Sequence, residues 1–446
     1  MSPAIRLRSP PAVSMGHVAR DADLLVLAPL FPSINQAWMD RYLEQMLDTG
    51  WRPCILSTRV ERAQCNPRIR DLGLLARTRI VPDSLKHGLA AALRFAACHP
   101  VRAARIARRM LDMDNATTVG AESYRGRISM VLRSWQYASL LAHSPSLRIC
   151  HAHSIDMAYP LIPVLAEAGV PLVYTFHGLK PRGVPQLDRE RMREVLRRAS
   201  IVLANTTNSV QQLSALGCPT DRIRIVPQGI PLDEFPFAPI APPSEGEALR
   251  IISVGRLHAD KGYGYAALAL RRMRDQGQRL AWEIVGAGPH ENRLRRLVER
   301  LGLEDITTFH GTMPSASVGA LFRRSHIMIL ASLSARNSFE HVETQGVVIQ
   351  EAQASGCLVV ASAVGGIPEC IDDGQDGFLV EERNHRALAN TLRELIERPD
   401  TWKATREQAR CRVVERYGAE YIGRCTDAIL RATVAEMKKG SAFRAL

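Results

Sequence analysis

Short apolar runs, each the length of a buried β-strand, alternate with helix-length segments along most of this chain. Asp23–Ala28 and Pro53–Ser57 are two such runs, and the segment between them repeats Met39, Leu43 and Met46 at helical spacing. A strand, a helix and a second strand in this order are typical of a parallel sheet. A mostly helical stretch is expected next, over 85–142. It is followed by expected strands at Leu147–Cys150, Pro171–Phe176, Ile201–Ala204 and Arg222–Val226.

A proline-rich segment interrupts the alternation at 236–248, where Pro236, Pro239, Pro242 and Pro243 leave no periodic pattern. The alternation then resumes, and 446 residues are enough for two domains, each with its own core. Two parallel sheets in tandem place a ligand cleft where the carboxyl ends of their strands face each other. The second set of strands is expected at Arg250–Val254, Ala281–Val285, Ile306–Phe309, Ile327–Leu330 and Cys357–Ala361.

The sequence therefore predicts an α/β chain with two Rossmann-like, doubly wound parallel-sheet domains. We expect the last helix to cross back to the first domain, because no strand follows it. The expected divisions are a loose N-terminal arm at 1–21, a first domain at 22–235, the linker at 236–248, a second domain at 249–415 and a C-terminal helix at 416–440.

The formal net charge of +13 requires an anionic partner or environment. Nucleic acid is not expected, because aromatic residues make up only 5% of the chain and no recognised nucleic-acid motif occurs. Anionic lipid headgroups and phosphorylated substrates account for the excess equally well.

Part of this charge is concentrated in one expected helix. In a helix, Ile106, Met110 and Met113 adjoin a face of arginines, a composition typical of a helix lying on an anionic membrane surface. An arginine-rich helix packed on the domain with its charges in water fits the same pattern. The arginines are Arg94, Arg102, Arg105, Arg108 and Arg109.

Nothing in the sequence predicts a membrane span or a secretory signal. No run of eighteen apolar residues occurs, and residues 1–21 contain arginines and prolines without an apolar core. The nine cysteines show no paired spacing, which predicts reduced thiols. We expect a cytoplasmic protein, attached peripherally to the inner face of the plasma membrane if the arginine-rich helix binds lipid.

An anion site is predicted where a short helix begins at Val347. The N–H groups of Gly346, Val347 and Val348 lie at its positive end, between Glu343 in the preceding loop and Glu351 one turn further on. A diphosphate fits there, with carboxylates on either side to accept hydrogen bonds from sugar hydroxyls. A capped surface helix with two solvated glutamates fits the same spacing.

Two more stretches at expected strand ends carry suitable chemistry. Arg256 and Lys261 flank a tight turn, and a guanidinium with an ammonium suits two phosphate groups, although two solvated surface cations have the same pattern. His177 follows a strand and precedes Gly178, so its ring would face the cleft unless it is structural.

Other chemistries find weaker support. A dinucleotide-dependent oxidoreductase would rest only on Gly286 and Gly288, without a third glycine. His151 and His153 share a strand face, but no cysteine or carboxylate accompanies them at metal-ligand spacing, so we expect no metal. No Gly-x-Ser-x-Gly motif of a serine hydrolase occurs.

The ordered motifs resemble the retaining nucleotide-sugar glycosyltransferases of family 4, which have the two-domain GT-B fold. They also resemble the branch that builds bacterial exopolysaccharide and capsule, through Phe31-Pro32-Ser33 and His151-Ala152-His153. The motifs are Phe176-His177-Gly178, Val226–Ile230, Gly255-Arg256-Leu257 with Lys261-Gly262, Gly286–Pro289, the two glutamates with Glu-Ala-x-Ala-x-Gly, Gly365–Glu369 and Asp376–Val380.

The resemblance implies a role for each candidate residue. Arg256 and Lys261 would hold the donor diphosphate with the N–H groups of Gly346, Val347 and Val348. Glu351 would bind the ribose hydroxyls, Glu343 would bind hydroxyls of the donor sugar, and His177 would lie beside the anomeric carbon of that sugar.

It further implies hexosyl transfer with retention of configuration, from a UDP- or GDP-sugar to a glycan or polyprenyl-diphosphate-linked acceptor, without metal or cofactor. The glycine pair common after the first strand of such enzymes is absent, with Ser33-Ile34-Asn35-Gln36 in its place, and Gln228 stands where asparagine is usual. A non-catalytic nucleotide-sugar-binding protein is therefore the alternative.

Overall fold

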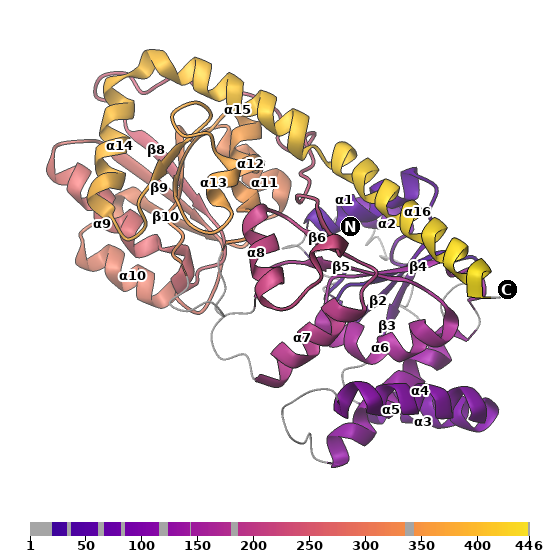
Figure 1. Ribbon diagram of the computed structural model, residues 1–446. Helices are drawn as coiled ribbons and strands as arrows, with labels where there is room; N and C mark the ends of the chain where they lie inside the picture. Colours follow the sequence, from indigo (N-terminus) through magenta and orange to yellow (C-terminus); the bar gives the residue numbers. More distant parts are fainter. Residues whose placement is uncertain are drawn as a thin grey trace, which may run out of the picture.

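Two α/β lobes make up the protein in its computed structural model, and the long C-terminal helix, α16 (Ala419–Arg444), runs along the first of them (Figure 1). The sequence-predicted N-terminal arm, 1–21, lies outside the described part except for its last two residues. The structure describes residues 20–33, 37–60, 67–81, 85–115, 124–142, 144–179, 186–334 and 343–444.

The first lobe contains a seven-stranded sheet in the order β3-β2-β1-β4-β5-β6-β7, and every pair of neighbours is parallel. The order runs outward from β1 and β4 in opposite directions, which is the doubly wound arrangement predicted from the sequence. Its strands are β1 (Leu24–Leu27), β2 (Pro53–Ser57), β3 (Thr78–Ile80), β4 (Ile149–Ala152), β5 (Leu172–Phe176), β6 (Ile201–Ala204) and β7 (Ile223–Ile225).

Helices connect these strands, and the amphipathic pattern of the first one is confirmed. Met39, Leu43 and Met46 of α1 are all buried against the sheet. The helices are α1 (Ala37–Asp48), α2 (Pro67–Asp71), α3 (Leu85–Cys98), α4 (Pro100–Asn115), α5 (Tyr124–Leu141), α6 (Ile155–Ala168), α7 (Gln186–Arg198) and α8 (Thr207–Ala215).

The second lobe repeats the plan with six parallel strands in the order β10-β9-β8-β11-β12-β13. The strands are β8 (Leu249–Val254), β9 (Leu280–Val285), β10 (Thr307–Gly311), β11 (Ile327–Leu330), β12 (Leu358–Ser362) and β13 (Phe378–Val380). The helices are α9 (Tyr263–Asp275), α10 (Glu291–Arg300), α11 (Ser315–Phe322), α12 (Val347–Ser355), α13 (Ile367–Cys370), α14 (His385–Glu397) and α15 (Trp402–Tyr417).

Strands β3 and β13 were not predicted; each has only three residues and lies at an edge of its sheet. Strand β3 contains Arg79, and β13, although apolar throughout, is too short to be recognised as the apolar run that marks an inner strand.

The arginine-rich stretch expected as one helix is divided between α3, which carries Arg94, and α4, and of the two alternatives for its apolar face the packed one holds in α4. Ile106, Met110 and Met113 are buried in the core of the first lobe, and Arg105 forms an ion pair with Glu167 at 3.0 Å. Helix α4 therefore packs on the lobe and presents its remaining arginines to solvent. In the described part of the chain, no helix has the length and apolar character needed to cross a membrane.

The chain passes between the lobes twice, and the two passages lie side by side. Ile230 donates its backbone N–H to Tyr417 at 2.8 Å and accepts one from Ala419 at 2.9 Å. The following proline-rich segment lies on the second lobe, where Arg406 donates to the carbonyl of Ile240 at 2.7 Å.

Beyond the second passage, α16 packs against α1 of the first lobe. The indole N–H of Trp51 donates to Asp427 at 2.6 Å, and Arg431 donates to the carbonyl of Thr49 at 2.6 Å. Leu430 and Val434 are buried in the same apolar cluster as the inner face of α1. The C-terminal helix thus belongs to the core of the first lobe.

We expect Asp427→Ala to lower the free energy of unfolding by about 1–2 kcal/mol, because the indole N–H of the buried Trp51 loses its acceptor. Urea denaturation followed by circular dichroism measures this change. Glu436→Ala on the exposed face of the same helix is the control and should change stability by less than about 0.5 kcal/mol. Equal stability of both variants would contradict the role given to this contact.

Candidate active site

A cleft of about 750 Å³ lies between the two lobes. Its walls come from residues that follow strands of both sheets, with Trp38 and His153 from the first lobe and Thr312 from the second. The structure brings all the sequence-predicted site residues to this one cleft. They are His177, Arg256, Lys261, Glu343, Gly346, Val347, Val348 and Glu351.

The start of α12 forms one wall of the cleft. Gly346 precedes the helix with a φ of +73°, in the left-handed region that favours glycine. A Cβ on Gly346 would also lie 3.0 Å from the Cδ1 atom of Ile349, so a side chain is disfavoured there twice over. The N–H groups of Val347 and Val348 belong to the first helical turn, where the helix supplies no acceptor and its dipole attracts anions.

Lys261 and Glu343 form an ion pair in the wall of the cleft, and each side chain is only 13% exposed. Ser332 also donates to Glu343, at 3.4 Å. The pairing neutralises both charges in a partly buried place, where an isolated charge is costly. An anionic ligand that approaches Lys261 would compete with Glu343 for the same ammonium group.

Arg256 lies at the same cleft after β8 and is exposed. Among the described residues, no acidic side chain forms an ion pair with its guanidinium. Arg256 and the start of α12 therefore leave positive potential in the cleft even while Lys261 is paired.

Glu351 lines the cleft from within α12 and is half-buried. Burial raises the pKa of this carboxyl to about 8, and the nearby charge of Glu234 adds to the effect. Near neutral pH the group is therefore mainly protonated in the free protein and can both donate and accept a hydrogen bond.

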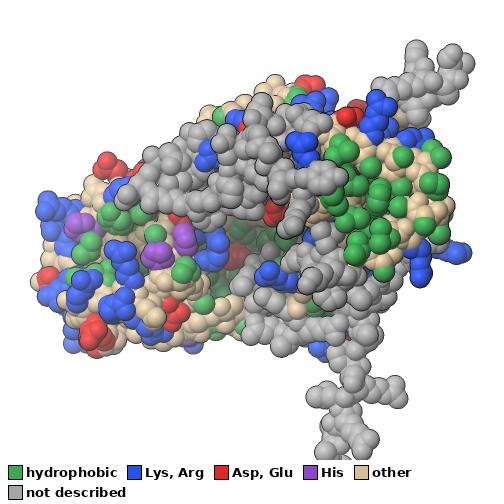
Figure 2. All heavy atoms as spheres, turned by 90° about the horizontal axis from the view of Figure 1, so that it is seen from below, with side chains coloured by type: hydrophobic (Ala, Val, Ile, Leu, Met, Phe, Trp, Pro, Cys, Tyr) green, Lys and Arg blue, Asp and Glu red, His purple; other side chains and the backbone are tan. Residues whose placement is uncertain are grey.

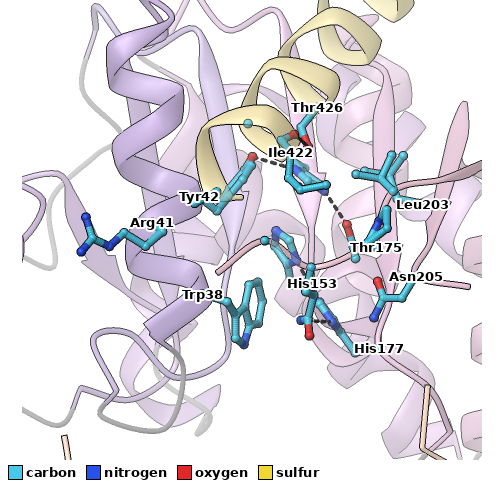
Figure 3. A pocket seen from close by; sticks show the side chains of 17 residues that line it. Trp38, Arg41, Tyr42, His153, Thr175, His177, Leu203, Asn205, Ile422 and Thr426 are labelled. Carbon is cyan, nitrogen blue, oxygen red and sulfur yellow. Dashed lines mark hydrogen bonds between the residues drawn. The ribbon is translucent and has the colours of Figure 1, made fainter. Parts of the chain in front are cut away.

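Three histidine rings lie together at the first-lobe side of the cleft (Figure 3). His151 uses both ring nitrogens within the lobe, with the Tyr42 hydroxyl at 2.6 Å and the Thr175 hydroxyl at 2.7 Å. The Nε2 atom of His177 lies 3.0 Å from the Nδ1 atom of His153. Burial lowers the pKa of His177 to about 4 and that of His151 to about 3, so both rings are neutral at pH 7.

The shared strand face of His151 and His153 is confirmed, since their ring centroids lie 4.3 Å apart. The hydrogen bonds of His151 occupy the nitrogens that a metal would need. Over the described residues, no group of three or more histidine, cysteine or acidic side chains could hold a metal ion.

Sequence reasoning missed two residues that shape the cleft. The ring of Trp38 lies 4.8 Å from that of His177, centroid to centroid. The buried side chain of Gln345 accepts from the backbone N–H of Gln228 at 2.7 Å and donates to the carbonyl of Gln228 at 3.1 Å. An aromatic residue beside the first turn was the one available signal for Trp38, whereas nothing near Gln345 in the sequence indicates its distant partner.

The glycine turn after β9 has a packing role. A Cβ on Gly286 would lie 2.0 Å from the carbonyl oxygen of Gly255, and one on Gly288 would lie 2.4 Å from that of Leu257. Both glycines are therefore required where the turns after β8 and β9 meet, and this contact explains the pair without a dinucleotide.

We expect the stability difference between the wild type and Glu351→Gln to depend on pH. The carboxyl has an ordinary pKa of 4.5 when unfolded and about 8 when folded, so the folded state binds more protons between these values. Wild-type stability should fall relative to the variant as pH rises from 4.5 to about 8, and the difference should then stay level.

Urea unfolding of both proteins from about pH 5 to about pH 9 measures this trend. The exposed Glu415→Gln is the control and should show no such slope. A constant difference between the wild type and Glu351→Gln at all pH values would contradict the raised pKa.

Comparison with known families and structures agrees with this geometry. Residues 237–412 match the family described as Glycosyl transferases group 1, and residues 90–234 match Glycosyltransferase Family 4. The first range covers most of the second lobe and the start of α12, and the second covers most of the first lobe from α3 onward.

Similar proteins extend the likeness over nearly the whole chain. A protein named as a colanic acid biosynthesis glycosyltransferase, WcaL of Salmonella typhimurium, is 29% identical over 408 residues, which are 90% of this chain and 97% of WcaL. The amylovoran biosynthesis glycosyltransferase AmsK of Erwinia amylovora is 33% identical over 184 residues, 41% of this chain and 44% of AmsK.

Among solved structures, Anabaena Alr3699/HepE in complex with UDP has a TM-score of 0.68 at 17% identity, covering 92% of this chain and 100% of its own. At this identity the likeness establishes the fold, which is that of the GT-B glycosyltransferases. The chain therefore contains a glycosyltransferase family 4-like domain followed by a glycosyltransferase group 1 domain, arranged in the GT-B fold.

Proposed function

We propose that this protein transfers a hexosyl group, with retention of anomeric configuration, from a UDP- or GDP-sugar to a glycan or polyprenyl-diphosphate-linked acceptor. The observation that carries the proposal is the convergence of Arg256, Lys261 and the start of α12 on one cleft, with Glu343 and Glu351 on either side. HepE has been solved with UDP and with UDP-glucose, which supports the donor class. The names of WcaL and AmsK support a place in bacterial surface polysaccharide synthesis.

The diphosphate is the leaving group, and its negative charge grows as the bond to the sugar breaks. Arg256, Lys261 and the N–H groups at Val347 and Val348 are positioned to stabilise that charge. In this proposal the reaction needs neither a metal ion nor a cofactor. Binding of the diphosphate to Lys261 would release Glu343, whose carboxylate could then accept hydrogen bonds from the donor sugar.

Transfer would take place on one face of the sugar. The acceptor oxygen forms its bond to the anomeric carbon on the side from which the diphosphate leaves, and the acceptor proton passes to a diphosphate oxygen. Entry and departure on the same face preserve the anomeric configuration. His177 lines the same cleft, and because burial lowers its pKa to about 4 the ring is a weak base, so a positioning role fits it better than that of a general base.

We also propose that the protein is cytoplasmic and binds the anionic inner face of the plasma membrane through the outer face of α3 and the start of α4. Leu93 is 51% exposed and Val101 68% exposed, and Leu89 lies one turn before Leu93. Figure 2 shows apolar side chains gathered at this end of the first lobe with basic side chains around them. The apolar side chains would enter the boundary of the acyl chains, and the exposed Arg94 and Arg108 would bind the anionic headgroups.

We expect Lys261→Met and Glu343→Gln each to lower turnover at least about 100-fold, because each removes charge or hydrogen bonding that acts on the reacting groups. A thermal-shift screen with UDP-, GDP- and ADP-sugars identifies the donor. Release of nucleoside diphosphate in the presence of polyprenyl-diphosphate-linked glycans then measures turnover.

Lys403→Met, an exposed lysine on α15, is the matched control and should retain wild-type turnover. Circular dichroism checks that each variant is folded. Turnover near that of the wild type in Lys261→Met would exclude the proposed diphosphate site. Donor binding by the wild type without transfer to any acceptor would favour the non-catalytic alternative.

For the membrane surface, we expect the protein to sediment with vesicles rich in phosphatidylglycerol and not with pure phosphatidylcholine. The double variant Leu89→Ser/Leu93→Ser should bind about tenfold more weakly, because two apolar side chains no longer leave water on binding. Val414→Ser, a similarly exposed apolar residue of the second lobe, should bind as the wild type does. Equal sedimentation with both kinds of vesicle would contradict the proposal.

A further inference from the structure

A second, smaller cavity of about 60 Å³ lies behind His177 in the first lobe (Figure 3). Trp38, His153 and His177 line both this cavity and the large cleft, so the two adjoin at these side chains. One water molecule needs roughly 10–15 Å³ of such volume, so the cavity accepts a small substituent but not a sugar ring.

Most polar side chains around the cavity already have hydrogen-bond partners, but Asn205 does not. Asn205 is only 2% exposed, and neither its Nδ2 nor its Oδ1 atom has a hydrogen-bond partner in the described part of the chain. The Nε2 atom of His153 is also buried and also has no hydrogen-bond partner in the described part of the chain. Buried polar groups in folded proteins are nearly always paired, so three such atoms around one cavity indicate a polar occupant.

The hydrogen bonds that link Gln228, His177 and His153 determine whether each unpaired atom is a donor or an acceptor. The side-chain amide of Gln228 donates to Nδ1 of His177 at 3.2 Å, which leaves the proton of this neutral ring on Nε2. His177 then donates to Nδ1 of His153 at 3.0 Å, so His153 carries its own proton on Nε2. The cavity therefore offers two donors, from His153 and Asn205, and one acceptor, from Asn205. A single hydroxyl group accepts two hydrogen bonds and donates one, which matches this set.

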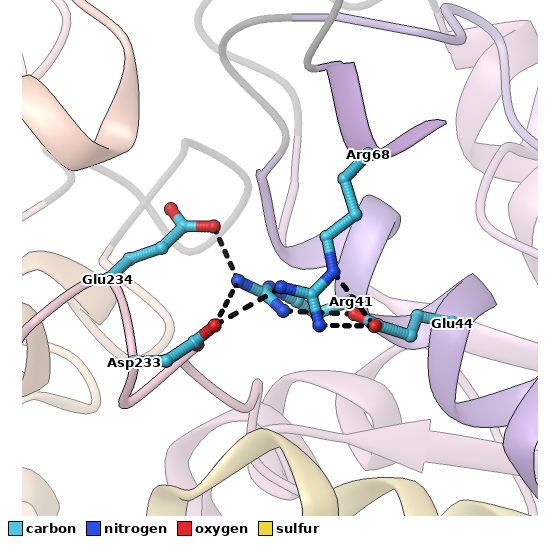
Figure 4. A network of polar contacts seen from close by, with 5 residues as sticks. All are labelled: Arg41, Glu44, Arg68, Asp233 and Glu234. Atoms are coloured by element: carbon cyan, nitrogen blue, oxygen red, sulfur yellow. Dashed lines mark hydrogen bonds and ion pairs between the residues drawn. The ribbon is translucent and has the colours of Figure 1, made fainter. Parts of the chain in front are cut away.

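None of the described residues that line the cavity offers an unpaired charge. Arg41 lines it, but its guanidinium points away in Figure 3 and forms ion pairs with Glu44, Asp233 and Glu234 (Figure 4). The buried histidine rings are neutral because burial lowers their pKa values. A carboxylate in this cavity would remain without a counter-charge, which disfavours acidic substituents.

We propose that this cavity is a subsite for the exocyclic hydroxymethyl group of a neutral sugar held in the cleft, with the ring of Trp38 against the sugar at the mouth. The hydroxymethyl group extends beyond its ring by one carbon, so its hydroxyl can reach Asn205 while the ring stays in the cleft. The inference rests on the proposed function. The sugar can belong to the donor or to the acceptor, because the cavity recognises the same group in either.

Binding of defined sugars tests the subsite. Saturation-transfer NMR with methyl α-D-glucopyranoside and methyl α-D-xylopyranoside, which lacks the hydroxymethyl group, probes a free sugar in the presence of UDP. Titration with UDP-glucose and UDP-xylose probes a donor sugar. In one of these pairs, we expect the wild type to bind the sugar with the hydroxymethyl group about tenfold more tightly. Methyl α-D-glucuronopyranoside, with a carboxylate in that position, should bind more weakly than the glucoside.

Asn205→Ala should abolish the preference in whichever pair shows it, which identifies the sugar concerned. It should leave the melting temperature unchanged or higher, because it removes a buried amide without partners. Asn208→Ala, three residues further on and outside the cavity, is the control and should keep the preference.

Equal binding within both pairs, a preference that survives Asn205→Ala, or a lower melting temperature of that variant would each overturn the subsite. If UDP-sugars bind but neither pair of sugars shows the preference, the subsite fails and the proposed function stands. If no nucleotide-sugar binds, the proposed function itself fails.

Discussion

The ion pair of Lys261 and Glu343 is possible because of the order of strands in the second sheet. Strands β8 and β11 are neighbours, and the sheet runs outward from them in opposite directions. Lys261 follows β8, while Glu343 and α12 follow β11, so the turn and the helix start meet at the point where the strand order reverses. The first lobe has its own reversal between β1 and β4, and there Trp38 and His153 reach the same cleft. The order of the strands thus determines where the site lies, and the side chains determine its chemistry.

Much of this arrangement could be predicted from the sequence, since parallel strands buried on both faces leave continuous apolar runs and carry functional residues at their ends. Two things could not. Periodicity identified an apolar face on α4, but it did not indicate whether protein or lipid covers that face; Met110 lies in the core, while the exposed Leu93 belongs to α3. Side chains such as Gln345 and Asn205 were missed because their environment comes from elements distant in the sequence; Gln345 and its partner Gln228, for example, are 117 positions apart.

Contacts between the lobes lie close to the start of α12. Thr206 donates its hydroxyl to the carbonyl of Thr344 at 2.8 Å, two residues before Gly346. Beside it, the carboxylate of Glu369 accepts the N–H groups of Thr207 and Asn208 at 2.7 and 2.8 Å, so an acidic side chain of one lobe caps a helix of the other. The position of the first lobe is therefore coupled to the segment that would hold a diphosphate.

The paired passages at Ile230 and Gly418 determine how the two lobes can move relative to each other. A single connecting strand would allow the lobes to swing and twist about many axes, whereas two adjacent strands joined by backbone hydrogen bonds resist twisting and sliding. The easiest remaining displacement is a rotation about the line through both passages. Such a rotation widens or narrows the cleft while α16 stays fixed to the first lobe, so the long C-terminal helix acts as a rigid arm of that lobe.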